Sequence, residues 1–178
     1  MTSSKVEKYT GVSIGLHWLL AIALIVQIGL GLWMGDIPKG QPERAYYFNL
    51  HKSVGMVLFA LVVIRVWWRA GHPAPALPAA MVGWQRSAAT ASHHLLYLCM
   101  FVMPLSGFIG SNFTKYGVKF FGTQVGPWGW EDKGIYAVLN GIHEWCGTLF
   151  MIIIGVHVLA AVKHLVVDRD QVFERMLP

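Results

Sequence analysis

Residues 135–167 read IYAVLNGIHEWCGTLFMIIIGVHVLAAVKHLVV, a long apolar run that carries three histidines, His143, His157 and His164. His157 follows His143 by fourteen residues, and His164 follows His157 by seven. At about 100° per residue, both steps return to nearly the same face of a helix. His143 and His157 would lie roughly 21 Å apart along the axis, which is most of the ~30 Å hydrocarbon thickness of a bilayer. Placing an ionisable group inside a membrane costs free energy, so each of these histidines suggests a functional role. Each should then have an interaction partner elsewhere in the chain.

The composition is that of an integral membrane protein. The chain has 178 residues, of which 55% are hydrophobic and 13% charged, and its mean hydropathy is +0.50. It has room for about four spans of ~20 residues each. The net charge is +5, but no basic cluster is interleaved with aromatic residues, so we expect no nucleic-acid binding. Cys99 and Cys146 form no CxxCH unit, which excludes c-type haem attachment.

The apolar runs predict an all-α fold, a membrane-spanning four-helix bundle in a single domain, 1–178. Breaker clusters delimit four spans, at residues 12–34, 49–69, 88–110 and 135–167. The polar exceptions in the first span are Ser13, His17 and Gln27. This span is too long for the apolar region of a signal peptide, so we expect it to remain in the protein as a membrane span. Pro104 should kink the third helix, and residues 81–86 favour a short interfacial helix.

Four spans place both termini on one side of the membrane. The side with the termini would carry eight basic residues: Lys5, Lys8, Arg65, Arg69, Arg86, Lys163, Arg169 and Arg175. The other side would carry six: Lys39, Arg44, Lys52, Lys115, Lys119 and Lys133. The positive-inside rule therefore favours cytoplasmic termini, by a small margin.

Alternating helix directions pair the histidines by depth. His17 and His157 would lie towards the cytoplasmic side, and His51 and His143 towards the outer side. Each pair takes one imidazole from the fourth helix, which is how a bundle holds a planar cofactor between facing helices. The residue four positions beyond each histidine is small: Ala21, Gly55, Gly147 and Ala161. Such residues leave room for a flat macrocycle, although they are also typical of tight helix packing in membranes.

A single membrane histidine is more often a hydrogen-bonded packing residue than a ligand, but four that pair by depth favour ligation. Zinc fits poorly, because two nitrogens at each level are too few and Glu144 is the only acid nearby. We interpret the pairs as two haem sites, each with bis-histidine ligation. Two axial histidines fill the iron coordination sphere, which indicates electron transfer rather than oxygen binding.

Several motifs at these positions resemble the bacterial cytochrome b561 family of small four-helix, di-haem b membrane cytochromes. They are LHW at 16–18, HKSVG at 51–55, His93 ahead of PLSG at 104–107, IHE at 142–144, GVH at 155–157 and KH at 163–164. The resemblance covers essentially the whole chain. It implies a multi-pass protein of the bacterial inner membrane, with His17 and His157 on the cytoplasmic-side haem and His51 and His143 on the periplasmic-side haem.

The resemblance also implies an activity, superoxide oxidase, in which superoxide gives up electrons on the periplasmic side and ubiquinone is reduced near the cytoplasmic side. Four basic residues, Arg44, Lys52, Lys115 and Lys119, would leave an outer surface that draws an anion towards the haem edge. A solvated or lipid-headgroup face is an equally good interpretation of the same residues.

The candidates for quinone binding are His93, His164 and Ser13. Histidine titrates near neutral pH and can exchange a proton with a quinone oxygen, and Ser13 lies one turn before His17. His93 and His94 are equally well explained as interfacial polar residues. We interpret Arg65 and Arg69 as interfacial anchors of the second helix rather than partners of haem propionates, and expect His72 to be exposed.

A second function remains open, in which the chain is a haem b membrane-anchor subunit that carries electrons for a dehydrogenase such as a hydrogenase or a formate dehydrogenase. The short tail and modest loops offer little docking surface, which favours a stand-alone, monomeric protein. A transporter or a purely structural protein would require the histidines to be free of haem.

Overall fold

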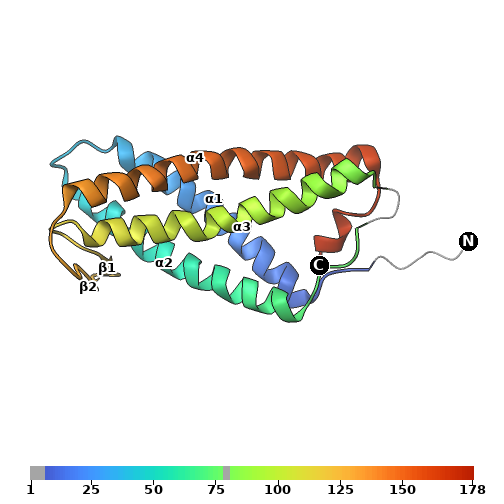
Figure 1. The fold of residues 1–178 in the computed structure, drawn as a ribbon, viewed down its shortest axis with the longest axis horizontal. Helices are drawn as coiled ribbons and strands as arrows, with labels where there is room; N and C mark the ends of the chain where they lie inside the picture. Colours follow the sequence, from blue (N-terminus) through green and yellow to red (C-terminus); the bar gives the residue numbers. More distant parts are fainter. Residues whose placement is uncertain (1–6, 78–80) are drawn as a thin grey trace, which may run out of the picture.

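The computed structural model describes residues 7–77 and 81–178, which fold into four long helices. They are α1 (Gly11–Asp36), α2 (Pro42–Gly71), α3 (Gly83–Asn112) and α4 (Lys133–Lys163). All four are long and apolar enough to cross a membrane, so the predicted four-helix membrane bundle is confirmed and the chain is a multi-pass membrane protein. The first described residue, Glu7, and the C-terminus lie at one end of the bundle, here called the terminal end (Figure 1). The opposite end, with strands β1 and β2, is the hairpin end.

Two predicted boundaries are wrong. The second span begins at Pro42 rather than at residue 49, because Pro42 starts the helix at a position where its missing N–H costs nothing. The aromatic residues 46–48 therefore lie on α2 and not in a connector. The expected short helix at 81–86 is not separate either, since Gly83 begins α3, which then continues through Pro104. Lys5, counted among the basic residues of the terminal end, lies outside the described residues.

The fourth span changes its winding in its last turn. Residues His164–Asp168 form one π-helical turn, closed by a 2.8 Å bond from the Arg169 N–H to the His164 carbonyl. Arg169 is left-handed, with φ of 50°, and the chain reverses there. The last residues return to α1 at the terminal end, where Trp18 Nε1 donates to the Met176 carbonyl at 2.7 Å.

The helices pack as two close pairs, α1 with α2 and α3 with α4, and α2 also packs against α3. One buried cluster joins the first pair: Leu20, Leu58 and Val62. A second joins the other pair: Cys99, Phe150 and Ile153. Among the described residues, α4 packs closely along α3 but not along α1 or α2. Most other large apolar side chains are exposed, as expected of a surface that faces lipid.

The hairpin end is closed by the segment between α3 and α4. It contains the antiparallel strands β1 (Lys119–Phe120) and β2 (Thr123–Gln124), joined by Phe121 and Gly122, both with positive φ. Ser53 of α2 is 1% exposed and fastens this segment to the bundle. Its Oγ accepts from the Phe121 N–H at 2.9 Å and lies 3.2 Å from the Lys119 carbonyl.

We therefore expect Ser53→Ala to lower the stability of the protein. The substitution leaves the Phe121 N–H without its partner, which costs about 1–3 kcal/mol. Thermal unfolding in detergent, followed by circular dichroism, should show a lower Tm. Ser87→Ala is the matched control, because Ser87 is exposed and, among the described residues, its hydroxyl bonds to the Gly83 carbonyl of its own helix. Equal Tm values for the two variants would contradict the anchoring role.

Candidate functional site

The structure brings the four predicted histidines together as two pairs. At the terminal end, the ring centroids of His17 on α1 and His157 on α4 are 6.3 Å apart. At the hairpin end, those of His51 on α2 and His143 on α4 are 6.2 Å apart. Both pairs span the wider separation between α4 and the α1–α2 pair. The two levels of the bundle therefore have nearly the same geometry.

These separations fit one metal ion between two facing imidazoles. A metal–nitrogen bond of about 2 Å and roughly 1 Å from nitrogen to ring centre, taken twice, give about 6 Å. Each pair could therefore hold the iron of one haem. Zinc would require two further protein ligands or water at each level, and the described residues place no carboxylate in contact with either ring pair.

The hairpin-end pair is held in place by groups on α3 and α1. The carbonyl oxygen of Met103 lies 2.7 Å from His143 Nδ1 and accepts its proton, which leaves Nε2 as the free nitrogen. A Cβ at Gly107 would lie 2.7 Å from His143 Nδ1, and one at Gly31 would lie 3.0 Å from His51 Cε1. A side chain at Gly107 would force the His143 ring to shift, and one at Gly31 would require the His51 ring to move by a few tenths of an ångström.

Sequence reasoning missed the contribution of Gly31, Gly107 and Gln27. Gln27 was visible as a polar exception in an apolar span, and the structure shows that its Nε2 donates to the His51 carbonyl at 2.7 Å. Gly107 belongs to the PLSG motif at 104–107, but the motif alone does not show that it faces His143. Gly55, expected to leave room for a macrocycle, faces Gln27, since a Cβ there would lie 3.4 Å from Gln27 Nε2.

Arg65 reaches from α2 to α1 at the terminal end. Its Nη1 donates to the Ser13 carbonyl at 2.9 Å, and its Nη2 lies 3.4 Å from His17 Nδ1. Arg65 therefore joins α2 to α1, which is compatible with the expected role as an anchor of the second helix. Its guanidinium also places a fixed positive charge beside the terminal-end pair.

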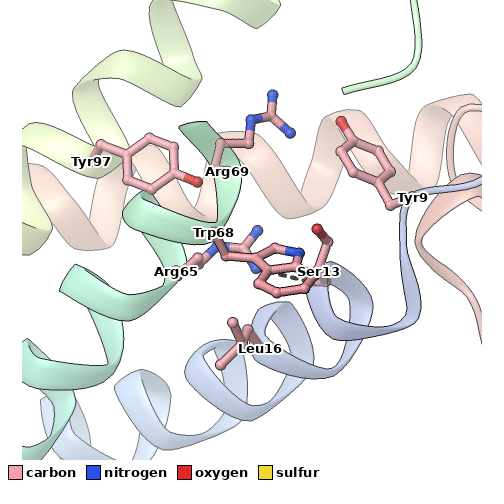
Figure 2. A pocket seen from close by; sticks show the side chains of 7 residues that line it. All are labelled: Tyr9, Ser13, Leu16, Arg65, Trp68, Arg69 and Tyr97. Carbon is pink, nitrogen blue, oxygen red and sulfur yellow. Dashed lines mark hydrogen bonds between the residues drawn. The ribbon is translucent and has the colours of Figure 1, made fainter. Parts of the chain in front are cut away.

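Two of the three quinone candidates lie near this pair. His93 on α3 is exposed, and its ring centroid lies 5.6 Å from that of His157. Ser13 is buried and lines a small pocket (Figure 2) with Tyr9, Leu16, Arg65, Trp68, Arg69 and Tyr97. The pocket volume is about 10 Å³, enough for one water molecule but too small for a quinone ring.

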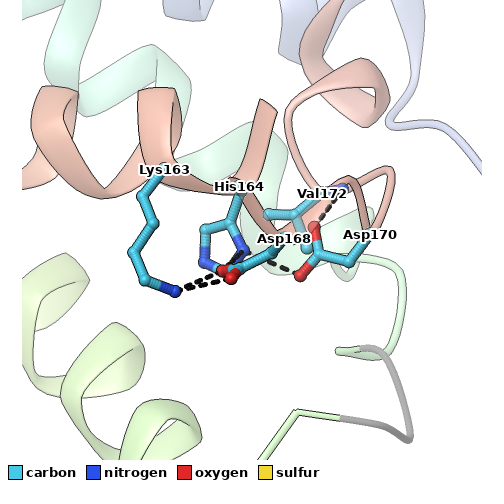
Figure 3. Close-up of polar contacts among 5 residues, drawn as sticks. All are labelled: Lys163, His164, Asp168, Asp170 and Val172. Atoms are coloured by element: carbon cyan, nitrogen blue, oxygen red, sulfur yellow. Dashed lines mark hydrogen bonds and ion pairs between the residues drawn. The ribbon is translucent and has the colours of Figure 1, made fainter. Parts of the chain in front are cut away.

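The third candidate, His164, is bonded to acidic residues (Figure 3). Its Nδ1 lies 2.7 Å from Asp170 Oδ2 and 3.3 Å from Asp168 Oδ2. These three residues offer ligand atoms within 4.8 Å of one another, a set that could hold a metal ion. Lys163 Nζ, however, lies 2.5 Å from Asp168 Oδ2 and already balances that carboxylate. His164 Nδ1 is therefore not free to bond a quinone oxygen in this arrangement.

The four basic residues predicted to steer an anion separate into two groups. Arg44 donates to the Met34, Gly35 and Ile37 carbonyls and so caps the C-terminus of α1. Lys52 is half-buried and donates to the Gly117 carbonyl at 3.3 Å. Lys115 and Lys119 are the two that remain exposed at the hairpin end.

Two other histidines lie apart from the pairs. His72 follows α2 and stacks on Trp68 with ring centroids 3.9 Å apart. It is half-buried, so the expectation that it is exposed is wrong. His94 is exposed on α3.

Comparison with known proteins gives a family for nearly the whole chain. The family model for prokaryotic cytochrome b561 matches residues 8–178. Cytochrome b561 homolog 2 of Escherichia coli (strain K12) is 33% identical over 172 residues, which cover 96% of this chain and 92% of that protein. Cytochrome b561 homolog 1 of the same organism is 24% identical over 172 residues, 97% of this chain and 98% of that protein. The probable superoxide oxidase CybB of Yersinia pestis is 25% identical over 183 residues, 97% of each chain.

The close approach of Gly107 to His143 can be tested by substitution. Gly107→Ala should lower the haem content, because the new Cβ would push the His143 ring from its position. Helix propensity acts in the opposite direction, since Gly→Ala normally stabilises a helix by up to about 1 kcal/mol. The haem content per chain of the purified variant is measured by the pyridine haemochrome assay.

Gly141→Ala is the matched control for this substitution. A Cβ at Gly141 would meet no atom within 4 Å, and Gly141 lies about 200° around α4 from His143. We expect this variant to keep the haem content of the wild type. A Gly107→Ala protein with unchanged haem content would show that the close approach of α3 to His143 has no role in ligation.

Proposed function

Since the chain belongs to the prokaryotic cytochrome b561 family, whose members are haem b membrane proteins of electron transfer, we propose that it is a superoxide:ubiquinone oxidoreductase with two haems b. One observation carries the proposal: each end of the bundle has one pair of facing imidazoles, 6.3 Å and 6.2 Å apart. The name of the probable superoxide oxidase from Yersinia pestis supports the choice of substrate.

In this proposal, His17 and His157 hold one haem and His51 and His143 hold the other. Haem iron with two axial imidazoles supplies one-electron transfer and leaves no open position for oxygen. His143 and His157 are separated by roughly 21 Å along α4, so the two sites lie towards opposite faces of a ~30 Å hydrocarbon layer. The hairpin end would face the periplasm of a bacterial inner membrane, and both termini the cytoplasm.

The first experiment counts the haems. We expect two haems b per chain in the wild type, and one in each of the variants His17→Ala and His143→Ala, because each variant removes an axial ligand of a different site. The pyridine haemochrome assay and redox difference spectra of the purified proteins measure this. His94→Ala is the control and should keep both haems, since His94 lies outside both pairs. A wild type with a single haem that is still bound in both His17→Ala and His143→Ala would overturn the pairing.

The overall reaction needs protons at one end only. Two superoxide ions each lose one electron and become dioxygen, with no proton required. Ubiquinone gains these two electrons and two protons to become ubiquinol. The proton-exchanging groups near the terminal-end pair are therefore the quinone candidates, above all His93, which is exposed and lies against His157. Arg65 and Ser13 are the further polar groups there.

At the hairpin end, the exposed cations Lys115 and Lys119 would attract superoxide. We expect the double variant Lys115→Gln/Lys119→Gln to reduce superoxide-driven ubiquinone reduction by roughly two- to ten-fold at low salt, with a smaller effect at high salt. The control, Lys8→Gln/Arg169→Gln, removes the same net charge from the terminal end and should keep the wild-type rate. Equal rates in the two double variants would contradict steering by the hairpin end.

The same assay separates the dehydrogenase-anchor alternative. A purified single chain that contains haem and reduces ubiquinone with superoxide supports the proposed function. A chain with two haems that does so no faster than the uncatalysed reaction would overturn it and favour a role as an electron-carrier subunit.

A further inference from the structure

Two buried polar atoms beside the hairpin-end pair have no hydrogen-bond partner among the described residues. They are Gln27 Oε1 and His51 Nδ1. An amide oxygen can only accept a hydrogen bond, and a ring nitrogen that carries a proton can donate one. Inside a membrane span there is no water to satisfy either atom, so leaving both without partners is costly. The two atoms are complementary.

Gln27 is already attached to the residue that carries the second atom. Its side chain is 5% exposed, and its Nε2 donates to the His51 carbonyl at 2.7 Å. With Nε2 engaged in this way, Oε1 is the atom that remains for another bond. The amide is therefore fixed at the backbone of His51. A Cβ at Gly55, one turn after His51 on the same face of α2, would lie 3.4 Å from Gln27 Nε2, so the amide lies on the face of α2 that carries His51.

The unpartnered edge of the His51 ring faces α1, the helix of Gln27. Gly31 lies one turn beyond Gln27 on the same face of α1. From a Cβ position at Gly31, the distances are 3.0 Å to His51 Cε1, 3.5 Å to Nδ1 and 3.9 Å to Nε2. The Nδ1–Cε1 edge is therefore nearer to α1, and Nε2 is the nitrogen farther from it.

The other member of the pair shows which contact is missing. His143 has its Nδ1 2.7 Å from the Met103 carbonyl, which fixes the tautomer and leaves Nε2 free. Histidines that ligate metals nearly always donate their second ring N–H to such an acceptor. The described residues give His51 no backbone carbonyl in that position.

We propose that Gln27 is a positioning residue for His51: a side-chain rotation that brings these two unpartnered atoms together lets Gln27 Oε1 accept the His51 Nδ1–H. The inference rests on the proposed function, because it concerns His51 as a ligand of the hairpin-end haem. Gln27 would then hold His51 at two points, the carbonyl and the ring, and keep Nε2 available for iron. A donated Nδ1–H also increases the electron density on the ligating nitrogen, which lowers the reduction potential of that haem.

Two substitutions at Gln27 test this role in opposite directions. Gln27→Met keeps a similar volume without an amide, and should raise the midpoint potential of the hairpin-end haem and weaken haem binding there by about 10- to 100-fold. Gln27→Glu offers a stronger acceptor and should lower the same potential. Both are measured by redox titration and haem retention, in the full chain and in the His17→Ala background, which isolates the hairpin-end haem.

The controls separate positioning from packing. The terminal-end haem of the same molecules should keep its potential, and Gln41→Met should change neither haem, since Gln41 is exposed and makes no capping side-chain bond. Unchanged potentials and haem retention in both Gln27 variants would overturn the proposal. If Gln27→Met does not fold, the direction of the shift in Gln27→Glu decides. A wild type with no haem bound at His51 and His143 would overturn the proposed function itself.

Discussion

The rest of the structure depends on how α4 faces the two helices that it does not pack closely against. Its backbone lies along α3, while His143 and His157 meet imidazoles from α2 and α1. At each level, the two imidazoles face each other at a distance that fits one metal ion between them. An iron at each level would join the two closely packed helix pairs, so cofactor binding and assembly of the bundle would be one process.

The number of spans and the two histidine pairs could be predicted from the sequence for a simple reason. Helix length, the alternation of helix direction and the fourteen-residue step from His143 to His157 determine the depth of each histidine without reference to side-chain contacts. The start of α2 could not be predicted in the same way. Residues 42–48 combine a proline with aromatic residues, which suits an interfacial connector and an extra helical turn equally well.

The supporting contacts of the site could not be predicted, because they depend on how each helix is rotated about its own axis. A helix that is apolar on all sides gives little indication of which face meets its neighbour. Gln27 and Arg65 are visible in the sequence as polar residues within or at the end of a span, yet only the packed bundle shows that one holds the His51 backbone and the other approaches His17. The same holds for Gly31 and Gly107, since a close approach involves two helices.

The two ends of the bundle differ in a way that matches the two half-reactions of the proposed function. At the hairpin end, glycines and a backbone carbonyl approach the rings of the histidine pair, and Lys115 and Lys119 of the closing segment are exposed. One-electron oxidation of an anion is favoured by positive charges that attract the anion, and it requires no proton donor. At the terminal end, an exposed third imidazole, that of His93, lies against the pair, and a guanidinium lies beside His17. Reduction of a quinone needs protons as well as electrons, and histidine can deliver them near neutral pH. This chemical asymmetry is the one that the proposed function requires, with electrons passing from the hairpin end to the terminal end.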